Sequence, residues 1–212
     1  RQAPGLGKVL FKEVHARFGG RTRFWVSGGA PLDPAITEGF RGIGITILNG
    51  YGLTETAPVL AANGLMDNDP HSVGRPLPGV EIKIFDANQD GIGEVAARGP
   101  NVTPGYYRDR EATRETFRDG WFLTGDLGKL NPEGFLELKG RSKNLIVTPN
   151  GKNIHPEEVE EPLMRSPLFE EVGVVGVPAR DGGGEVVTAI VVPTPALMAE
   201  GMLCKETHEN VI

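Results

Sequence analysis

The sequence has a single cysteine, no excess of basic residues and no long apolar run, and each shortage excludes a class of protein. One cysteine, Cys204, cannot form a disulfide within the chain, which fits a reducing compartment and a cytoplasmic location. With 22 basic against 28 acidic residues, the net charge of −6 argues against a nucleic-acid partner. No apolar run approaches the roughly 20 residues that a membrane-spanning helix needs.

Histidine is scarce too, and its placement gives no metal-ligand spacing. The four histidines are scattered along the chain: His15, His71, His155 and His208. Residues 86–97 begin like a calcium loop, but Ala97 stands at the twelfth position, where such a loop carries Glu. Neither a Walker P-loop nor a Gly-x-Ser-x-Gly nucleophile turn occurs. These patterns therefore exclude several common types of site.

Residues 1–72 read as the end of an α/β domain. Apolar residues at spacings of three and four predict an amphipathic helix over 6–18, and a second helix is predicted at 31–40. A short β-prone run lies at 23–27. The β-branched apolar run at 43–48 is typical of a strand buried on both faces.

Residues 73–141 change to short strands. Runs rich in Val, Ile and Phe alternate with Gly, Pro, Asn and Asp turns, which is typical of a small antiparallel, barrel-like subdomain. The segments 93–100 and 104–107 are read as scaffold. The predicted strands are 81–85, 94–98, 121–124 and 135–138.

Residues 142–212 predict a partial, mobile α+β C-terminal domain. It has a helix at 156–165, with proline at its first position and acidic residues in its first turn. Its strands are expected at 145–148, 172–177 and 186–192, with a flexible Gly-rich turn at 181–184. The boundary is drawn at Arg141/Ser142, a charged junction between two apolar patterns that suits a hinge.

Two stretches combine residue types that a fold alone does not require. NGYGLTET at 49–56 follows directly on the predicted buried strand, and ligands bind beyond the carboxyl ends of strands in open α/β sheets. In 120–160, a Thr-Gly-Asp turn precedes a Gly-Arg pair, a lysine two residues later and a Gly-Lys-Asn turn. On these residues the sequence resembles the AMP-forming acyl-CoA synthetases, adenylate-forming enzymes that activate carboxylic acids with ATP. It is most similar to the long-chain fatty acid–CoA ligases.

The resemblance implies a nucleotide site around the first stretch. Tyr51 would stack on adenine, Asn49 would lie beside the adenine amino group, and Gly52 would belong to the same cofactor-binding turn. Thr54 would hydrogen-bond the phosphates, and Glu55 would hold the Mg²⁺ that bridges them. A carboxylate plus substrate phosphates is the usual ligand set of this ion. The alternative is a strand-to-helix turn with a Thr/Glu cap.

A glycine-rich turn after the first predicted strand belongs to the same implied site. The resemblance puts the adenine and acyl pocket against Gly28, Gly29, Ala30 and Pro31, and two glycines permit close backbone approach. The alternative is a tight turn into a helix that starts near proline.

The second stretch supplies the residues implied for ribose and for domain movement. Asp126 would accept hydrogen bonds from both ribose hydroxyls, and the planar Arg141 guanidinium would contact ribose and phosphate oxygens. Lys143 would be the hinge about which the small domain rotates between the two half-reactions. Gly151 would lie in a turn lining the pantetheine channel. The alternatives are a β-turn aspartate bonded to its own backbone and a surface ion pair for Arg141.

The implied parent enzyme uses ATP, Mg²⁺ and coenzyme A, with a fatty acid and CoA as its partners. Peripheral membrane association and a homodimer stay open. The chain begins at Arg1 inside a helix-like pattern, so we expect an excised piece. The family's phosphate-embracing loop and C-terminal lysine segment find no match in it, so the piece is expected to be inactive. Two alternatives remain: an acyl-AMP ligase that delivers to a carrier protein, and a non-catalytic nucleotide-binding or scaffold fragment.

Overall fold

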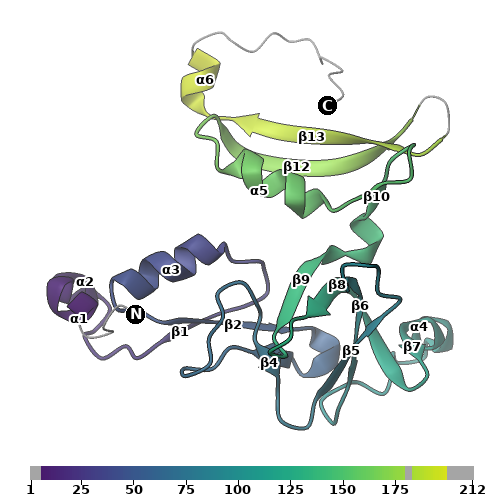
Figure 1. Ribbon diagram of the computed structural model, residues 1–212, viewed down its shortest axis with the longest axis horizontal. Helices are drawn as coiled ribbons and strands as arrows, with labels where there is room; N and C mark the ends of the chain where they lie inside the picture. The colour runs from purple at the N-terminus through teal and green to yellow at the C-terminus, as the bar shows by residue number, and fades with distance from the viewer. Residues whose placement is uncertain (1–5, 180–182, 200–212) are drawn as a thin grey trace. The chain divides into compact units, whose positions relative to one another are not determined.

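The computed structural model describes residues 6–179 and 183–199. The described chain is a mixed α/β protein with several separate sheets (Figure 1). It forms two compact units, one that extends to Leu138 and one that begins at Lys139.

A four-stranded mixed sheet belongs to the first unit. Its strands are β1 (Trp25–Ser27), β2 (Ile47–Gly52), β3 (Val59–Ala62) and β4 (Arg75–Pro76). β1 and β2 run parallel, with helix α3 (Pro34–Gly42) between them in sequence, whereas β3 and β4 are antiparallel additions. The Asp33 carboxylate accepts a hydrogen bond from the Ala35 N–H at 2.8 Å, and Pro34 occupies the first helical turn. This cap and proline explain why α3 begins there rather than at residue 31.

Two sequence predictions in this part were wrong in extent. The helix expected over 6–18 is two short helices, α1 (Leu6–Leu10) and α2 (Lys12–Arg17). The strand expected at 43–48 begins only at Ile47 and continues to Gly52, because Gly50, Tyr51 and Gly52 pair with β3. Asn49 and Tyr51 therefore lie within a strand and not in the turn after it.

An antiparallel sheet follows, in the order β5-β6-β8-β7, with β9 also paired to β8. The strands are β5 (Glu81–Phe85), β6 (Gly93–Arg98), β7 (Phe117–Arg118), β8 (Trp121–Leu130) and β9 (Leu136–Arg141). In the described residues, β5 pairs with β6 and does not meet β7, so the sheet is a curled half-barrel. The barrel-like prediction was right about the antiparallel strands, but the strands that the structure describes form a half-barrel and not a closed one.

Helix α4 (Arg110–Thr116) was not predicted, because its sequence carries no apolar period. It begins where the Asp109 carboxylate accepts a hydrogen bond from the Ala112 N–H at 2.9 Å. Local capping chemistry, rather than burial of an apolar face, therefore defines this helix.

One apolar core joins the two sheets of the first unit. Its buried members come from β2, β3, β6 and β9: Tyr51, Leu60, Ala61, Val95, Ala97 and Leu136. Leu60, Val95 and Leu136 are fully buried. Each such side chain stabilises the fold by about 1.5–3 kcal/mol relative to exposure. The core thus fixes β2 against the half-barrel.

The second unit contains two hairpins and a helix. The short hairpin is β10 (Ile146–Val147) with β11 (Asn153–Ile154), and the long one is β12 (Phe169–Pro178) with β13 (Glu185–Pro193). Helix α5 (Pro156–Met164) lies along β12, and its Glu160 carboxylate accepts a hydrogen bond from the Val174 N–H at 2.7 Å. The unit also contains the 3-10 turn η2 (Ser142–Asn144) and helix α6 (Pro195–Ala199).

The predictions for the second unit largely hold. The helix expected at 156–165 is confirmed to within one residue, and both long strands extend beyond their predicted ends. Part of the turn at 181–184 and Cys204 lie outside the described residues. Among the described helices, none has the length and apolar character needed to cross a membrane.

Candidate functional site

The turns that follow β1 and β2 leave the sheet at the same edge. The two strands are parallel, and Ser27 pairs in register with Asn49. Residues 28–31 follow the end of β1, and the 3-10 turn η1 (Thr54–Thr56) follows the end of β2. Parallel strands whose carboxyl ends meet in this way create the usual ligand edge of an open α/β sheet.

The two glycines after β1 occupy positions where the backbone disfavours a larger residue. A Cβ on Gly28 would lie 3.1 Å from the Gly50 carbonyl oxygen, and Gly29 has a positive φ of +83°. Gly28, Gly29, Ala30 and Pro31 are all exposed. The turn is therefore tight against β2 and open on its outer side.

Tyr51 and Asp126, 75 residues apart in sequence, form a buried hydrogen bond. The Tyr51 hydroxyl donates to Asp126 Oδ2 at 2.6 Å, and the two residues are 8% and 7% exposed. A short bond from a hydroxyl to a carboxylate belongs to the stronger class of hydrogen bonds. The Tyr-Gly-Leu-Thr-Glu and Thr-Gly-Asp motifs are thus in direct contact. The stacking of Tyr51 on adenine stays a prediction, since most of its surface packs in the core.

A β-bulge places Asp126. Ala96 pairs with Leu123 and Glu94 with Leu127, so residue 95 of β6 faces the three residues 124–126 of β8. Gly125 adopts a φ of +73° at this point. Bulges of this kind re-aim side chains and are common beside active sites. The strand predicted at 121–124 is confirmed, but the turn expected after it was wrong, because β8 continues through the bulge to Leu130.

The Thr124 hydroxyl holds the bulge together. It donates to the Val95 carbonyl at 2.7 Å and accepts from the Asp126 N–H at 3.2 Å, and Thr124 is buried. Thr124→Val keeps the size of the side chain but removes both bonds. Because two buried backbone groups lose this partner, we expect the free energy of unfolding to fall by about 1–3 kcal/mol. Chemical denaturation of the chain measures this. Thr22→Val, at an exposed hydroxyl, is the control, and equal losses in both variants would contradict the assignment.

The Thr54–Thr56 turn presents the residues predicted for phosphate and metal. Thr54 is exposed and Glu55 is half-buried. The Glu55 carbonyl accepts a hydrogen bond from the Thr103 N–H at 2.7 Å, and Glu55 Oε1 accepts one from the Tyr106 hydroxyl at 3.0 Å. Burial raises the pKa of Tyr106, and its bond to Glu55 raises it further. Sequence reasoning assigned Tyr106 to scaffold, because a contact across 51 residues leaves no local pattern.

Asn49 is a buried amide with unused hydrogen-bonding capacity. The residue is 8% exposed, and its side-chain Oδ1 has no hydrogen-bond partner. An unpaired buried acceptor is unfavourable by about 1–3 kcal/mol. An amino donor such as that of adenine matches this acceptor chemically.

Gly52 lies so close to the backbone of Pro58 and Val59 that a side chain does not fit between them. A Cβ at this position would lie 1.8 Å from the Pro58 carbonyl oxygen. The same carbonyl accepts a hydrogen bond from the Thr56 hydroxyl at 2.8 Å. The glycine predicted to bind the cofactor thus has a structural role in closing the turn after β2.

The remaining predicted residues lie in the second unit. Arg141 ends β9, Lys143 lies in η2, and both are exposed. Gly151 is exposed with a φ of +76°, in a turn where its N–H donates to the Thr148 carbonyl at 2.8 Å. The convergence of Arg141 and Asp126 on one ribose stays a prediction.

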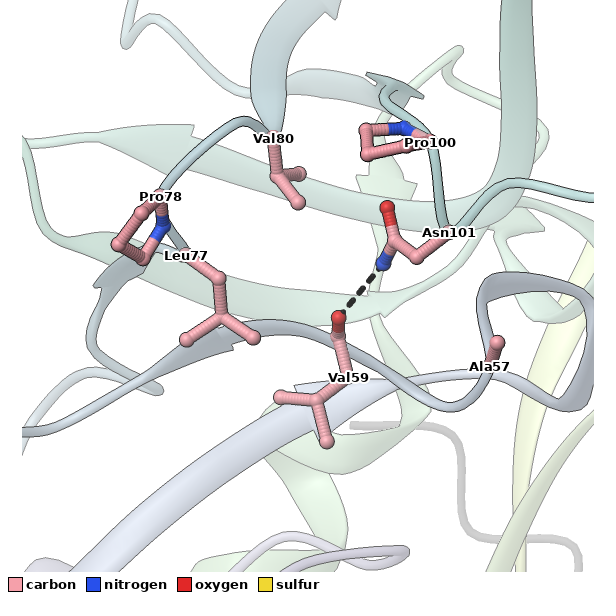
Figure 2. Close-up of a pocket in the computed structure, with 7 residues that line it drawn as sticks. All are labelled: Ala57, Val59, Leu77, Pro78, Val80, Pro100 and Asn101. Atoms are coloured by element: carbon pink, nitrogen blue, oxygen red, sulfur yellow. Dashed lines mark hydrogen bonds between the residues drawn. The ribbon is translucent and has the colours of Figure 1, made fainter.

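A cavity of about 320 Å³ lies beside the Thr54–Thr56 turn (Figure 2). Its walls are mainly apolar: Ala57, Val59, Leu77, Pro78, Val80, Pro100 and Asn101. Figure 2 shows the Asn101 amide pointing to the Val59 carbonyl, to which it donates at 2.8 Å. None of the residues predicted to bind nucleotide lines the cavity. Among the described residues, no group of three or more His, Cys, Asp or Glu could hold a metal.

Comparisons with known proteins find relatives that are similar in sequence and in fold. A family model described as AMP-binding enzyme matches residues 3–107. Long-chain-fatty-acid–CoA ligase FadD15 of Mycobacterium bovis is 43% identical over 80% of this chain and 27% of its own length. Long-chain-fatty-acid–[acyl-carrier-protein] ligase AEE15 of Arabidopsis thaliana is 34% identical over 97% and 30%. The chain therefore spans less than a third of these relatives. The structure of ATP-bound MatB from Rhodopseudomonas palustris superposes with a TM-score of 0.74 at 36% identity, over 89% of this chain and 41% of that one.

Proposed function

Because this chain belongs to the AMP-binding enzyme family of adenylate-forming ligases, we propose that the whole protein activates a long-chain fatty acid with ATP and transfers it to coenzyme A. The name of the Mycobacterium bovis relative supports this choice of acid and acceptor. The contact of Tyr51 with Asp126 is the single observation that carries the nucleotide site, because it unites two motifs from distant parts of the chain.

The proposed chemistry has two steps. An oxygen of the fatty carboxylate attacks the α-phosphorus of ATP, and the bond to the bridging oxygen breaks, releasing pyrophosphate. The CoA sulfur then attacks the acyl carbon and loses its proton, and AMP leaves with the electrons of the carbon–oxygen bond. Both steps need a nucleotide held rigidly near the acyl carbon, which the ligand edge of the first sheet supplies.

The side chains of this edge have distinct proposed roles. The exposed Thr54 hydroxyl donates to a phosphate oxygen, and the Asp126 carboxylate accepts from ribose. The side-chain Oδ1 of Asn49 accepts from the adenine amino group. In the second unit, Arg141 contacts ribose and phosphate, Lys143 is the hinge and Gly151 lines the thiol channel. Backbone groups of Gly28–Pro31 border the adenine and acyl pocket.

The donor set at Glu55 fits magnesium bound together with ATP. Glu55 offers one half-buried carboxylate on a turn held by hydrogen bonds, and the described residues offer no cage of three acidic or histidine ligands. One or two carboxylates plus substrate phosphates is the usual arrangement for this ion. When bound, magnesium offsets the negative charge that builds up on the phosphates.

Acid-dependent release of pyrophosphate tests the proposal. The whole protein, supplied with ATP, Mg²⁺ and palmitate, is expected to release pyrophosphate and then to form palmitoyl-CoA when CoA is added. No acid-dependent release above the acid-free control would contradict the function. We further propose that the 212 residues alone are inactive, since they span less than a third of the relatives. Pyrophosphate release by this chain would refute that part.

A carrier protein as acyl acceptor is the second candidate. The Arabidopsis thaliana relative is named for an acyl-carrier protein, which favours testing both acceptors side by side. Transfer to a phosphopantetheinylated carrier without transfer to CoA would select this alternative. Nucleotide binding without turnover of any acid would instead select a non-catalytic role.

A further inference from the structure

We propose that Tyr106 is a positioning residue that orients the Glu55 carboxylate toward the nucleotide-bound metal. This inference rests on the proposed function, because it deepens the role given there to Glu55. The Tyr106 hydroxyl donates to Glu55 Oε1 at 3.0 Å, and the hydrogen bond fixes that oxygen. The other carboxylate oxygen, Oε2, is the one assigned to the cation.

The backbone beneath Glu55 is held by the same segment, residues 101–106. The Thr103 N–H donates to the Glu55 carbonyl at 2.7 Å. The Asn101 amide donates to the carbonyls of Thr56 and Val59, both at 2.8 Å. Three residues of the 101–106 segment therefore make four hydrogen bonds, three to the Thr54–Thr56 turn and one to Val59 at the start of β3. Of these four, the bond from Tyr106 is the one that reaches a side chain.

Tyr106 is itself held in place from the other side. Its N–H donates to the Thr113 hydroxyl at 2.9 Å, and Thr113 belongs to helix α4. Gly105 sits directly against Thr113: an added Cβ would lie 2.5 Å from the threonine methyl group. These contacts fix the backbone of Tyr106 against α4, and the bond to Glu55 then holds the hydroxyl end of its half-exposed ring.

A single carboxylate that binds a metal together with phosphates binds it more tightly when a hydrogen bond already holds the carboxylate in place. Glu has three side-chain torsions, and holding them in one geometry is unfavourable in entropy. A hydrogen bond to one oxygen lowers that cost before the metal binds, in the way that outer ligands orient metal-binding side chains. The effect should appear in metal affinity more than in the stability of the fold.

The test compares Tyr106→Phe with Tyr107→Phe in the whole protein. Phenylalanine keeps the ring and removes only the hydroxyl. Tyr107 is 86% exposed, and its ring contacts the Arg108 guanidinium, so its hydroxyl is a matched control. Binding of Mn²⁺ as a paramagnetic probe is measured with ATP present. Turnover is then measured against Mg²⁺ concentration, and unfolding by calorimetry.

Tyr106→Phe is expected to weaken Mn²⁺ binding about threefold to tenfold, as for one lost hydrogen bond of ordinary net strength, because the bond between Tyr106 and Glu55 is exposed to solvent. Turnover of Tyr106→Phe should recover at high Mg²⁺, and its unfolding temperature should equal that of the wild type. Tyr107→Phe should match the wild type in Mn²⁺ affinity, turnover and unfolding temperature. Equal Mn²⁺ affinity in wild type and Tyr106→Phe, or no Mn²⁺ binding by the wild type with ATP, would overturn the inference. Weakened Mn²⁺ binding together with no acid-dependent turnover in the wild type would sustain the inference and contradict the proposed fatty-acid ligase.

Discussion

Asp126→Ala in the whole protein is expected to lower kcat/KM for ATP by roughly 100-fold, from two lost hydrogen bonds between the carboxylate and ribose. The same change removes the acceptor of the buried Tyr51 hydroxyl bond, so the free energy of unfolding should also fall, by about 1–3 kcal/mol. Steady-state kinetics at varied ATP and chemical denaturation measure the two effects.

Asp126→Asn separates these two roles. Its amide oxygen can still accept from the Tyr51 hydroxyl, whereas its amino group cannot accept from ribose. We therefore expect near-normal stability with a clear rise in KM for ATP. Normal KM in Asp126→Asn would show that Asp126 serves only the fold, and the nucleotide site would then have to lie elsewhere.

Of the substitutions proposed for this protein, Gly52→Ala is expected to lower the free energy of unfolding the most. A Cβ there would lie 1.8 Å from the Pro58 carbonyl oxygen and 2.8 Å from the Val59 Cα, and neither atom belongs to a flexible side chain. The backbone of β2 and β3 must shift, at about 3 kcal/mol or more. Thermal unfolding of the chain measures the change.

Gly39→Ala is the matched control for this substitution. Gly39 lies in α3, and nothing lies within 4 Å of an added Cβ. Alanine in a helix is favoured over glycine by about 0.5–1 kcal/mol. Gly39→Ala should therefore raise the unfolding temperature while Gly52→Ala lowers it. Similar temperatures for both variants would contradict the crowding assigned to Gly52.

Local patterns in the sequence predicted the elements that depend on local signals. The α5 helix was located because proline and glutamates mark its start, and β5 because a β-branched run stands between turn residues. The long-range pairing was not accessible in this way. β2 extends to Gly52 only because β3 pairs with it, and the bulge at Gly125 exists only relative to β6.

The candidate site shows the same division. Asp126 and Tyr51 were selected by their motifs, but the hydrogen bond between them follows from packing of two sheets. Tyr106 was passed over because its bond to Glu55 joins residues 51 positions apart and leaves no local pattern. Motifs thus selected the candidate groups of the site, and the contacts between those groups required the fold.

A crystal structure of the whole protein with a non-hydrolysable acyl-AMP analogue tests the central claim most directly. Both ribose hydroxyls are expected within hydrogen-bonding distance of the Asp126 carboxylate, with the adenine amino group at the unpaired Oδ1 of Asn49. An analogue bound away from this edge, with the bond between Tyr51 and Asp126 unchanged and no ligand atom near either residue, would contradict it.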